Sequence, residues 1–356
     1  MKVNVLSPGA KTPNGAGFIF PLWIFNNAFR DHGIFLSFFN RVTNRLCDCD
    51  TLLIDSKFHK TSWAKNTEKV LSEFAGWSER TRVIYFDTTD STGSLKTELL
   101  PYVDLYAKSQ LLKDTSQYSK SHYAERIFAD YYHREFGFTD DKPSFSKPET
   151  DPNLLKKLRL SWNSGMADHS FVGPFIGLCM RQFNFPILAR FATPIAGART
   201  RRALDISCRF GKSYSRRSVG AQRLMINQVL NTDTSKLRRL DYLKEMASSR
   251  IVISPFGLGE ITLKDFETFL CGAMLLKPDM SHMETWPNFF VPDVTIKTHS
   301  WNLEKLQDKI AELLNNDADR QEIAENGQRI YQKYTTGPDA AELFTSHFLK
   351  LLEPEQ

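Results

Sequence analysis

Two glutamates beside a glycine-containing turn are the residues of this chain most suited to chemistry. Glu260 and Glu267 lie in a segment that follows the apolar run Arg250–Ser254, which predicts a buried strand. In open parallel sheets, ligands bind at the carboxyl ends of the strands, so the turn Phe256–Ile261 is expected to face a site. Carboxylates repel phosphates, but they accept hydrogen bonds from hydroxyl groups. The pattern therefore indicates a site for a sugar or a ribose.

A short amphipathic helix is predicted to carry the second glutamate. Thr262 is a suitable N-cap and Gly272 a suitable stop, which places Glu267 in the first two turns. The apolar face repeats at helical spacing through Phe266, Phe269, Leu270 and Ala273. A plainer alternative stays open, in which Glu267 is a solvated helix carboxylate and Glu260 a turn residue.

A basic segment precedes this region. Between Arg199 and Arg223 there are eight cations and one acid, Asp205. Such a cluster attracts a polyanion, which could be a nucleotide diphosphate, a nucleic acid or anionic lipid headgroups. Nucleic-acid binding would call for a continuous basic face with stacking aromatics, and only Phe210 and Tyr214 interleave here.

Composition indicates an ordinary globular protein. The 356 residues suit two domains, with 41% hydrophobic and 24% charged residues. No signal-peptide pattern opens the chain, and its longest apolar run is too short to span a bilayer, so a cytoplasmic location is expected. The five cysteines are scattered and expected to be reduced. Cys47 and Cys49 lack the spacing of a zinc site, so no metal is expected.

Strands and helices are predicted to alternate in both halves of the chain. Strands are expected at 1–7, 51–54, 82–86, 203–208 and 250–254, a loop at 8–17, a largely helical stretch at 105–136, and closing helices at 303–315, 318–334 and 340–352. This order predicts an α/β protein with two Rossmann-like, doubly wound domains facing a central cleft. We expect one domain at 1–190, a second at 191–335, and a final helix at 336–356.

The segment around the two glutamates resembles the donor-nucleotide motif of GT-B glycosyltransferases. The likeness lies in the serine-proline strand end, the Gly-Glu and Phe-Glu pairs and the Cys-Gly-Ala turn, and it is specific over about residues 199–288. It is strongest to bacterial family 4-like and exostosin-like enzymes. By this resemblance Glu267 binds the donor ribose and Glu260 contacts the donor sugar. In family 4 the two glutamates have seven residues between them and here there are six, which leaves the role of Glu260 open.

The resemblance also implies a diphosphate site after the strand at 203–208. Arg209 and Lys212 are expected against the donor diphosphate, with Arg217 and Arg223 behind them. Fixed cations there would stabilise the negative charge that grows on the leaving group. The turn residues expected to contact the nucleotide-sugar are Ser254, Phe256, Gly257 and Gly259.

The resemblance implies that the domain at 1–190 supplies the acceptor side of the cleft and the domain at 191–335 the donor side. It also implies that the helix at 336–356 crosses back to the first domain. In GT-B enzymes the first loop faces the cleft, and the loop residues here are Asn14, Gly15 and Gly17. Asp87 and Asp90 follow a strand, where a carboxylate could act as a general base, although the same residues suit a plain Asx turn. His59, which also follows a strand, is a further candidate.

The implied function is transfer of a sugar from a nucleotide diphosphate-sugar, with UDP favoured, to a hydroxyl of a glycan or lipid-linked glycan. The resemblance implies bacterial polysaccharide synthesis of the O-antigen or capsule type, without a metal or resident cofactor. Peripheral contact with the inner membrane or with other transferases would fit this role. The glutamate pair favours retention, whereas a base at Asp90 would imply inversion. Two alternatives remain: a catalytically silent GT-B-like binding subunit, and a nucleic-acid-binding protein that uses residues 199–223.

Overall fold

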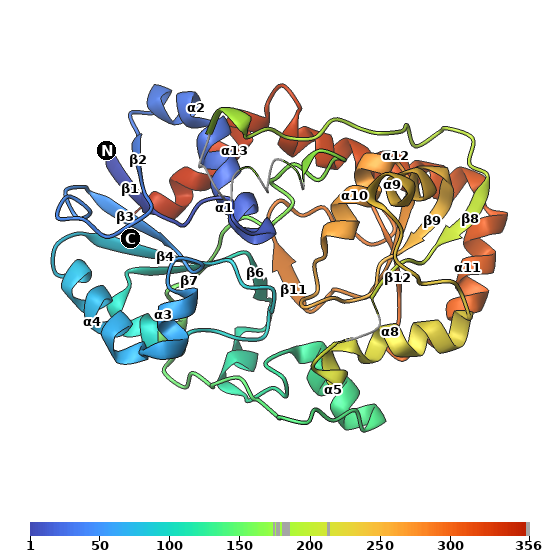
Figure 1. Cartoon of the computed structure of the whole chain (residues 1–356), viewed down its shortest axis with the longest axis horizontal. Helices are drawn as coiled ribbons and strands as arrows, with labels where there is room; N and C mark the ends of the chain where they lie inside the picture. The colour runs from blue at the N-terminus through green and yellow to red at the C-terminus, as the bar shows by residue number, and fades with distance from the viewer. Residues whose placement is uncertain (174, 176–178, 180–185, 212–213, 354–356) are drawn as a thin grey trace.

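The N-terminal half of the chain forms a parallel sheet in the computed structural model, which describes residues 1–173, 175, 179, 186–211 and 214–353 (Figure 1). In spatial order the strands are β2 (Phe35–Phe39), β1 (Lys2–Leu6), β3 (Thr51–Asp55), β4 (Arg82–Asp87), β5 (Leu105–Lys108) and β7 (Leu158–Leu160). Each pairs in parallel with its neighbour. The central strands β3 and β4 are almost wholly buried, as their continuous apolar sequences predict.

The expected loop at 8–17 is wrong in its second half, because a helix begins at Pro13. The helices of this domain are α1 (Pro13–Ile24), α2 (Asn26–Asp31), α3 (Lys60–Lys65), α4 (Thr67–Ser78), α5 (Ile127–Phe136) and α6 (Pro152–Leu155). The Thr12 hydroxyl accepts the Gly15 N–H at 3.1 Å, and proline fits the first helical position. Gly17 lets α1 approach closely, since a Cβ there would lie 2.7 Å from the Cα of Ser164.

The helix expected over residues 105–136 is also wrong in its first part. The chain there forms β5, a second short strand β6 (Gln110–Leu112) and a 3₁₀ turn at Thr115–Ser119 before α5 begins. β5 and β6 are fully buried. A short apolar run that is buried on all sides looks the same in a strand and in a helix, and periodicity does not distinguish them.

The C-terminal half forms a smaller parallel sheet. Its strands, in order, are β12 (Lys297–His299), β10 (Met274–Pro278), β9 (Ser249–Ile253) and β8 (Leu204–Ser207). The helices are α8 (Arg217–Leu230), α9 (Arg239–Ser248), α10 (Leu263–Cys271), α11 (Leu306–Asn315), α12 (Asp317–Thr335) and α13 (Ala340–Leu352). Among the described residues, no helix combines the length and apolar character required to cross a bilayer. Two parallel α/β sheets in one chain give the fold class expected from the sequence.

The last helix lies against the N-terminal domain. Figure 1 shows α13 beside α2, and Phe348 packs on Phe29 with ring centroids 4.9 Å apart. Phe344 contacts Trp162 in the same cluster. The guanidinium of Arg82 at the start of β4 donates to carbonyls at the end of α13. The chain thus returns to its first domain after completing the second.

Backbone pairing and a shared core join the two domains. β6 of the first domain pairs antiparallel with β11 (Met283–Thr285), which follows β10 of the second, and Figure 1 shows this two-stranded sheet between the domains. Phe128 on α5 packs against Phe256 with centroids 4.7 Å apart. Gln222 on α8 donates to the Tyr132 hydroxyl and accepts the Phe256 N–H. These contacts hold the facing edges of the domains in register.

Candidate functional site

Glu267 lies on α10 with its carboxylate held by two residues of α9. Thr262 caps the helix in a capping box with Asp265, and Gly272 ends it with φ of 61°, as the sequence predicts. The Glu267 side chain is 8% exposed, and its Oε1 forms an ion pair with Arg239. The Tyr242 hydroxyl donates to Oε2 at 2.9 Å. Each carboxylate oxygen keeps lone-pair capacity for a further donor.

The carboxylate faces a pocket between the domains, which we call the Glu267 pocket. It has a volume of about 300 Å³. Its walls include Lys11, Thr12 and Ala16 from the N-terminal domain, and Arg239, Leu263 and Glu267 from the C-terminal domain. The buried ring of His169, which is stacked on Phe266, also lines it, and burial lowers the pKa of this histidine. Glu267 therefore points into the space between the domains.

A second pocket adjoins the first, and we call it the Arg223 pocket. It measures about 340 Å³ and shares Thr12, Pro13 and Leu263 with the Glu267 pocket. Arg223 on α8 donates through Nε to the Phe256 carbonyl at 2.7 Å, and its guanidinium lies over the ring of Tyr214. Burial lowers the pKa of Arg223, although an arginine stays charged in proteins. The two pockets form an elongated site with a carboxylate at one end and a guanidinium at the other.

The turn after β9 forms one wall of the Arg223 pocket. Gly257 and Gly259 both line it. A Cβ at Gly259 would come within 1.8 Å of the Asp90 carbonyl oxygen, so only glycine lets this turn meet the N-terminal domain. Ser254 and Phe256 lie behind the turn and are buried. The Ser254 hydroxyl donates to Asp265 at 2.6 Å, so it supports the helix cap and does not line either pocket.

Glu260 lies in the joint between the domains and not among the pocket-lining residues. Its side chain is fully buried, and its Oε2 accepts the Thr92 N–H at 3.2 Å. His282 Nε2 lies 3.7 Å from the other oxygen. Burial acts to raise the pKa of Glu260, but His282 and the backbone N–H groups outweigh it and lower the pKa below its ordinary value. Glu260, to which the resemblance assigns the contact with the donor sugar, therefore lines neither pocket.

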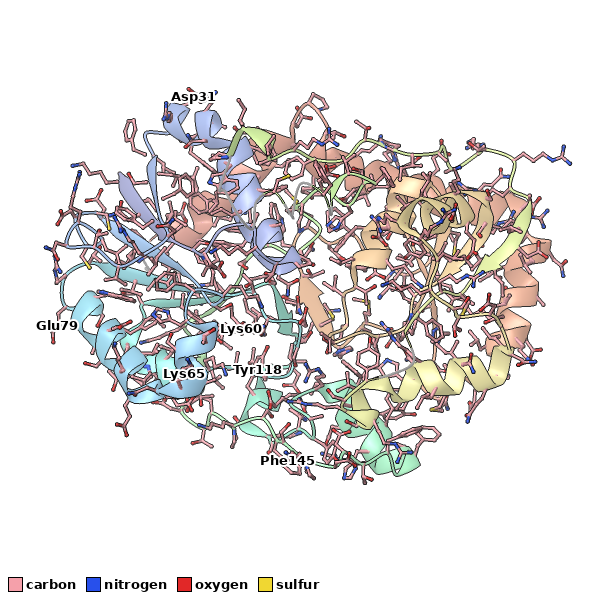
Figure 2. The ribbon with its side chains drawn as sticks, viewed as in Figure 1. Asp31, Lys60, Lys65, Glu79, Tyr118 and Phe145 are labelled. Carbon is pink, nitrogen blue, oxygen red and sulfur yellow. The ribbon has the colours of Figure 1, made fainter. Side chains whose placement is uncertain are left out.

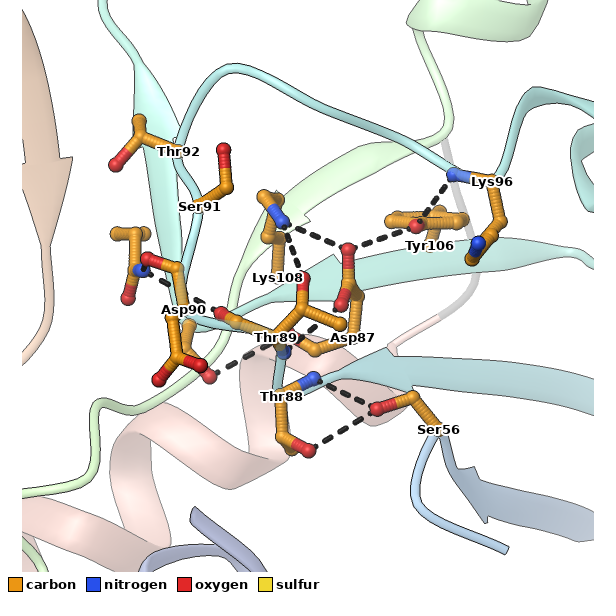
Figure 3. A network of polar contacts seen from close by, with 12 residues as sticks. Ser56, Asp87, Thr88, Thr89, Asp90, Ser91, Thr92, Lys96, Tyr106 and Lys108 are labelled. Carbon is orange, nitrogen blue, oxygen red and sulfur yellow. Dashed lines mark hydrogen bonds and ion pairs between the residues drawn. The ribbon is translucent and has the colours of Figure 1, made fainter. Parts of the chain in front are cut away.

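Asp87, the last residue of β4, and Asp90 in the turn that follows have different surroundings (Figure 3). Asp87 is buried in an ion pair with Lys108 at 2.7 Å, and the Tyr106 hydroxyl donates to it at 2.8 Å. Burial would raise the pKa of Asp87, but the Lys108 ammonium and the Thr89 hydrogen bonds lower it to about 2. Asp90 lies at both the Arg223 pocket and a smaller neighbouring cavity. Of the two, only Asp90 reaches the space between the domains.

Asn14 connects the first helix to Asp90. Its amide donates to Asp90 Oδ1 and to the Thr88 carbonyl, both at 2.9 Å. Asn14 and Gly17 line the cavities beside Asp90, and Gly15 packs against Gly9. The start of α1 therefore faces the second domain, as the resemblance implies for the first loop.

Other expected site residues are not brought to these pockets. His59 is buried against α4, 3.1 Å from Glu73, among aromatic rings. Arg209 forms ion pairs with Glu245 and Asp233. Arg217 is exposed at the start of α8. Lys212 lies outside the described residues. Of the expected diphosphate cations, Arg223 alone lines a described pocket.

Four cations at the site were not expected from the sequence, and one of them, Lys11, lines the Glu267 pocket. Arg239 holds Glu267 and also donates to the carbonyl of His169 at 2.7 Å. Lys57 and Lys60 line the Arg223 pocket from the N-terminal domain, and Figure 2 shows Lys60 on the side of α3 nearer to the second domain. Both lysines follow the carboxyl end of β3. Because ligands bind at the carboxyl ends of parallel strands, the reasoning that selected His59 could also have selected these lysines.

One family of known proteins matches the second domain. Residues 198–345 match a family model described as glycosyl transferase-like. The C-terminal domain is a glycosyltransferase domain. The two parallel-sheet domains agree with the architecture expected from the sequence, and the expectation of a glycosyltransferase domain is confirmed for residues 198–345. No curated protein matches the chain.

Several solved structures are similar to this chain over its whole length. HepE of Anabaena in complex with UDP has a TM-score of 0.47 and 12% identity, with 99% of each chain covered. A glycosyltransferase from Rickettsia africae has a TM-score of 0.48 and 9% identity, again with 99% of each chain covered. An alpha-glucosyltransferase in complex with UDP-glucose and DNA has a TM-score of 0.43 and 11% identity, covering 99% of this chain and all of that one.

Proposed function

We propose that this glycosyltransferase moves a sugar from a nucleotide diphosphate-sugar, UDP-linked first among the candidates, to a hydroxyl of a glycan or lipid-linked glycan. The observation that carries the proposal is the Glu267 carboxylate, which faces an interdomain pocket and adjoins a second pocket lined by Arg223. A carboxylate suits the two hydroxyls of a ribose, and a guanidinium suits a phosphate.

The two pockets share Leu263, which supports placing the ribose in one pocket and the diphosphate in the other. The ribose would lie against Glu267, whose position is fixed by Arg239 and Tyr242. The diphosphate would then extend past Leu263 towards Arg223. Leu263 is the first residue of α10, so the free N–H groups and the dipole of that helix favour negative charge at the same place.

The proposed reaction is transfer with retention. The bond between the anomeric carbon and the phosphate oxygen breaks, and the acceptor oxygen bonds to that carbon on the same face. The acceptor proton passes to the departing phosphate oxygen. Arg223 and the start of α10 would stabilise the charge that develops on the diphosphate. Asp90 is held by Asn14 at the same pocket and would orient the acceptor hydroxyl.

The acceptor side would be the N-terminal wall of the Arg223 pocket, which Asn14, Lys57, Lys60 and Asp90 line. The resemblance to family 4-like enzymes is the basis for proposing a glycan acceptor and a role in surface polysaccharide assembly at the cytoplasmic side of the membrane. A silent binding subunit remains the second candidate, because the donor-sugar contact at Glu260 is buried away from the pockets.

A donor screen tests the proposal. The melting temperature of the protein is measured with UDP-, GDP-, dTDP-, ADP- and CMP-linked sugars, and nucleotide release is then followed with the donor that binds. We expect stabilisation by one nucleotide class and slow hydrolysis of its sugar. The anomeric configuration of the released sugar, measured by NMR before the sugar mutarotates, distinguishes retention from inversion. Binding without any hydrolysis or transfer would favour the silent subunit, and no binding at all would refute the proposal.

A further inference from the structure

The basic segment at 199–223 is divided between two ends of the second domain. Arg199, Arg201 and Arg202 precede β8, whereas Arg209 and Arg223 follow it. A strand of four residues extends the chain by about 13 Å, so the first group lies at the opposite edge of the sheet from the Arg223 pocket. The first three arginines are therefore left without a part in the proposed donor site.

These arginines line a pocket of their own, which we call the arginine pocket. It has a volume of about 750 Å³. Five arginines contribute to its lining, against one acid, Asp317: Arg199, Arg201, Arg202, Arg250 and Arg320. Arg250 lies near the amino end of β9, and Gly272 lies two residues before the start of β10. The pocket thus opens at the amino ends of the strands, away from the space between the domains.

Two of the five arginines build the wall of the pocket. Arg202 donates to the carbonyls of Ala247 and Cys271 at 2.7 and 3.0 Å, which satisfies the ends of α9 and α10. Arg320 is 4% exposed and donates to the Leu313 carbonyl while pairing with Asp317. Their charge stays at the pocket, but their donors are largely used by the protein.

The other three arginines retain donors for a ligand. Arg201 is exposed and has no ion pair among the described residues. Arg250 reaches Asp205 through one nitrogen at 3.3 Å, and Arg199 pairs with Glu325 while 71% exposed. The pocket keeps a net positive charge, because its five guanidinium groups outnumber the three carboxylates that pair with them, Asp205, Asp317 and Glu325.

We propose that the arginine pocket is a second binding site, separate from the donor site, for a molecule that carries a phosphate ester. Forked guanidinium groups match the oxygens of a phosphate better than any other side chain. The volume exceeds what a single phosphate ion fills, so the ligand has a body beyond its charged group. A soluble phosphorylated sugar and an anionic lipid headgroup share this chemistry.

Calorimetry with inorganic pyrophosphate tests the site. Arg201→Ala combined with Arg250→Ala is expected to weaken binding at least about tenfold, because each removes charged hydrogen bonds. Arg329→Ala is the matched control, since it removes an exposed arginine of α12 outside the pocket. Arg223→Ala is expected to remove only the pyrophosphate binding that UDP displaces, and to leave the binding that persists in the presence of UDP unchanged. Equal affinity in the double variant, or loss of the binding that persists with UDP in Arg223→Ala alone, would overturn the proposal.

Two further experiments control for misfolding of the double variant and identify the class of ligand. Arg201→Glu alone, at an exposed and unpaired position, replaces the double variant if that variant does not show the wild-type circular dichroism. Sedimentation with phosphatidylcholine vesicles, with and without phosphatidylglycerol, separates a headgroup from a soluble ester. Binding to the anionic vesicles that is lost in the variant assigns the headgroup, and pyrophosphate binding alone assigns a soluble ester. Citrate that binds as tightly as pyrophosphate would contradict a phosphate site.

The arginine pocket does not depend on the donor assignment. The pyrophosphate titration is run with and without UDP, which occupies the donor site if the proposed function is correct. A failed donor screen with intact pyrophosphate binding would refute the proposed function only. A successful donor screen without pyrophosphate binding at the arginine pocket would refute the second site only.

Discussion

Replacing Glu267 with glutamine separates its proposed ribose contact from its structural one. Glutamine has nearly the same size. Its one oxygen can accept from Arg239 while its amide N–H donates to the Tyr242 hydroxyl, but the negative charge is lost. Removing one partner from a fully buried ion pair costs about 3–5 kcal/mol. Arg239 is 26% exposed and water can replace part of its contact, so we expect Glu267→Gln to lower the free energy of unfolding by only about 1–2 kcal/mol.

The effect on nucleotide binding is expected to be larger than the effect on folding. A hydrogen bond to a charged group contributes about 1.5–3 kcal/mol, so the Kd for UDP should rise about 10- to 150-fold. The assay is calorimetry of wild type and Glu267→Gln with UDP and with 2′,3′-dideoxy-UDP. The wild type should lose most of its affinity for the dideoxy nucleotide, and the variant should discriminate little between the two.

Glu245→Gln is the matched control for this cycle. Glu245 also pairs with an arginine and is 14% exposed, but it lines neither interdomain pocket. Its nucleotide affinity should equal that of the wild type. If wild-type protein binds UDP and the dideoxy nucleotide equally well, Glu267 does not contact the ribose and the reasoning fails.

Three further predictions concern the other groups of the site and its support. Arg223→Ala should reduce kcat/KM by roughly 10- to 100-fold with little change in melting temperature, and unchanged steady-state kinetics would remove it from the site. Asp87→Asn should lower the free energy of unfolding by about 3–5 kcal/mol in urea titrations, because it leaves Lys108 buried without its counter-charge; a change under about 1 kcal/mol would contradict this. The folded pKa of Asp87, about 2 against a usual 3.8, means that its contribution is present above pH 4 and is lost as the pH falls through 2. Burial raises the pKa of Asp55 to about 6, so the folded state binds the extra proton and stability should fall by roughly 2 kcal/mol as the pH rises from 4 to 6; Asp55→Asn should flatten that slope in unfolding titrations.

Local signals in the sequence predicted the second domain better than the first. The cap at Thr262 and the stop at Gly272 gave both ends of α10, and the predicted final helix at 340–352 agrees with α13. β2 was missed because its residues are half exposed and follow no clear alternation. β5 and β6 were read as helix because both are short and fully buried, which leaves no period to recognise.

The site shows the same division between local and distant information. The position of Glu267 at the interdomain space follows from the strand-end rule and could be predicted. Its partner Arg239 is 28 residues away, and a contact of that kind depends on how α9 packs on α10. Arg209 looked like a phosphate ligand because its charge is visible in the sequence, whereas the carboxylates of Asp233 and Glu245 that neutralise it become neighbours only in the fold.

The antiparallel pair β6–β11 has a consequence for how substrates enter. Its main-chain bonds cross from one domain to the other, and Lys113 adds another to the His282 carbonyl at 3.0 Å. Wide separation of the domains would break all of these bonds together. A rotation of one domain about this two-stranded sheet would preserve them. If the proposed nucleotide site is correct, nucleotide would then enter and leave on the side of the interdomain pockets away from the β6–β11 pair.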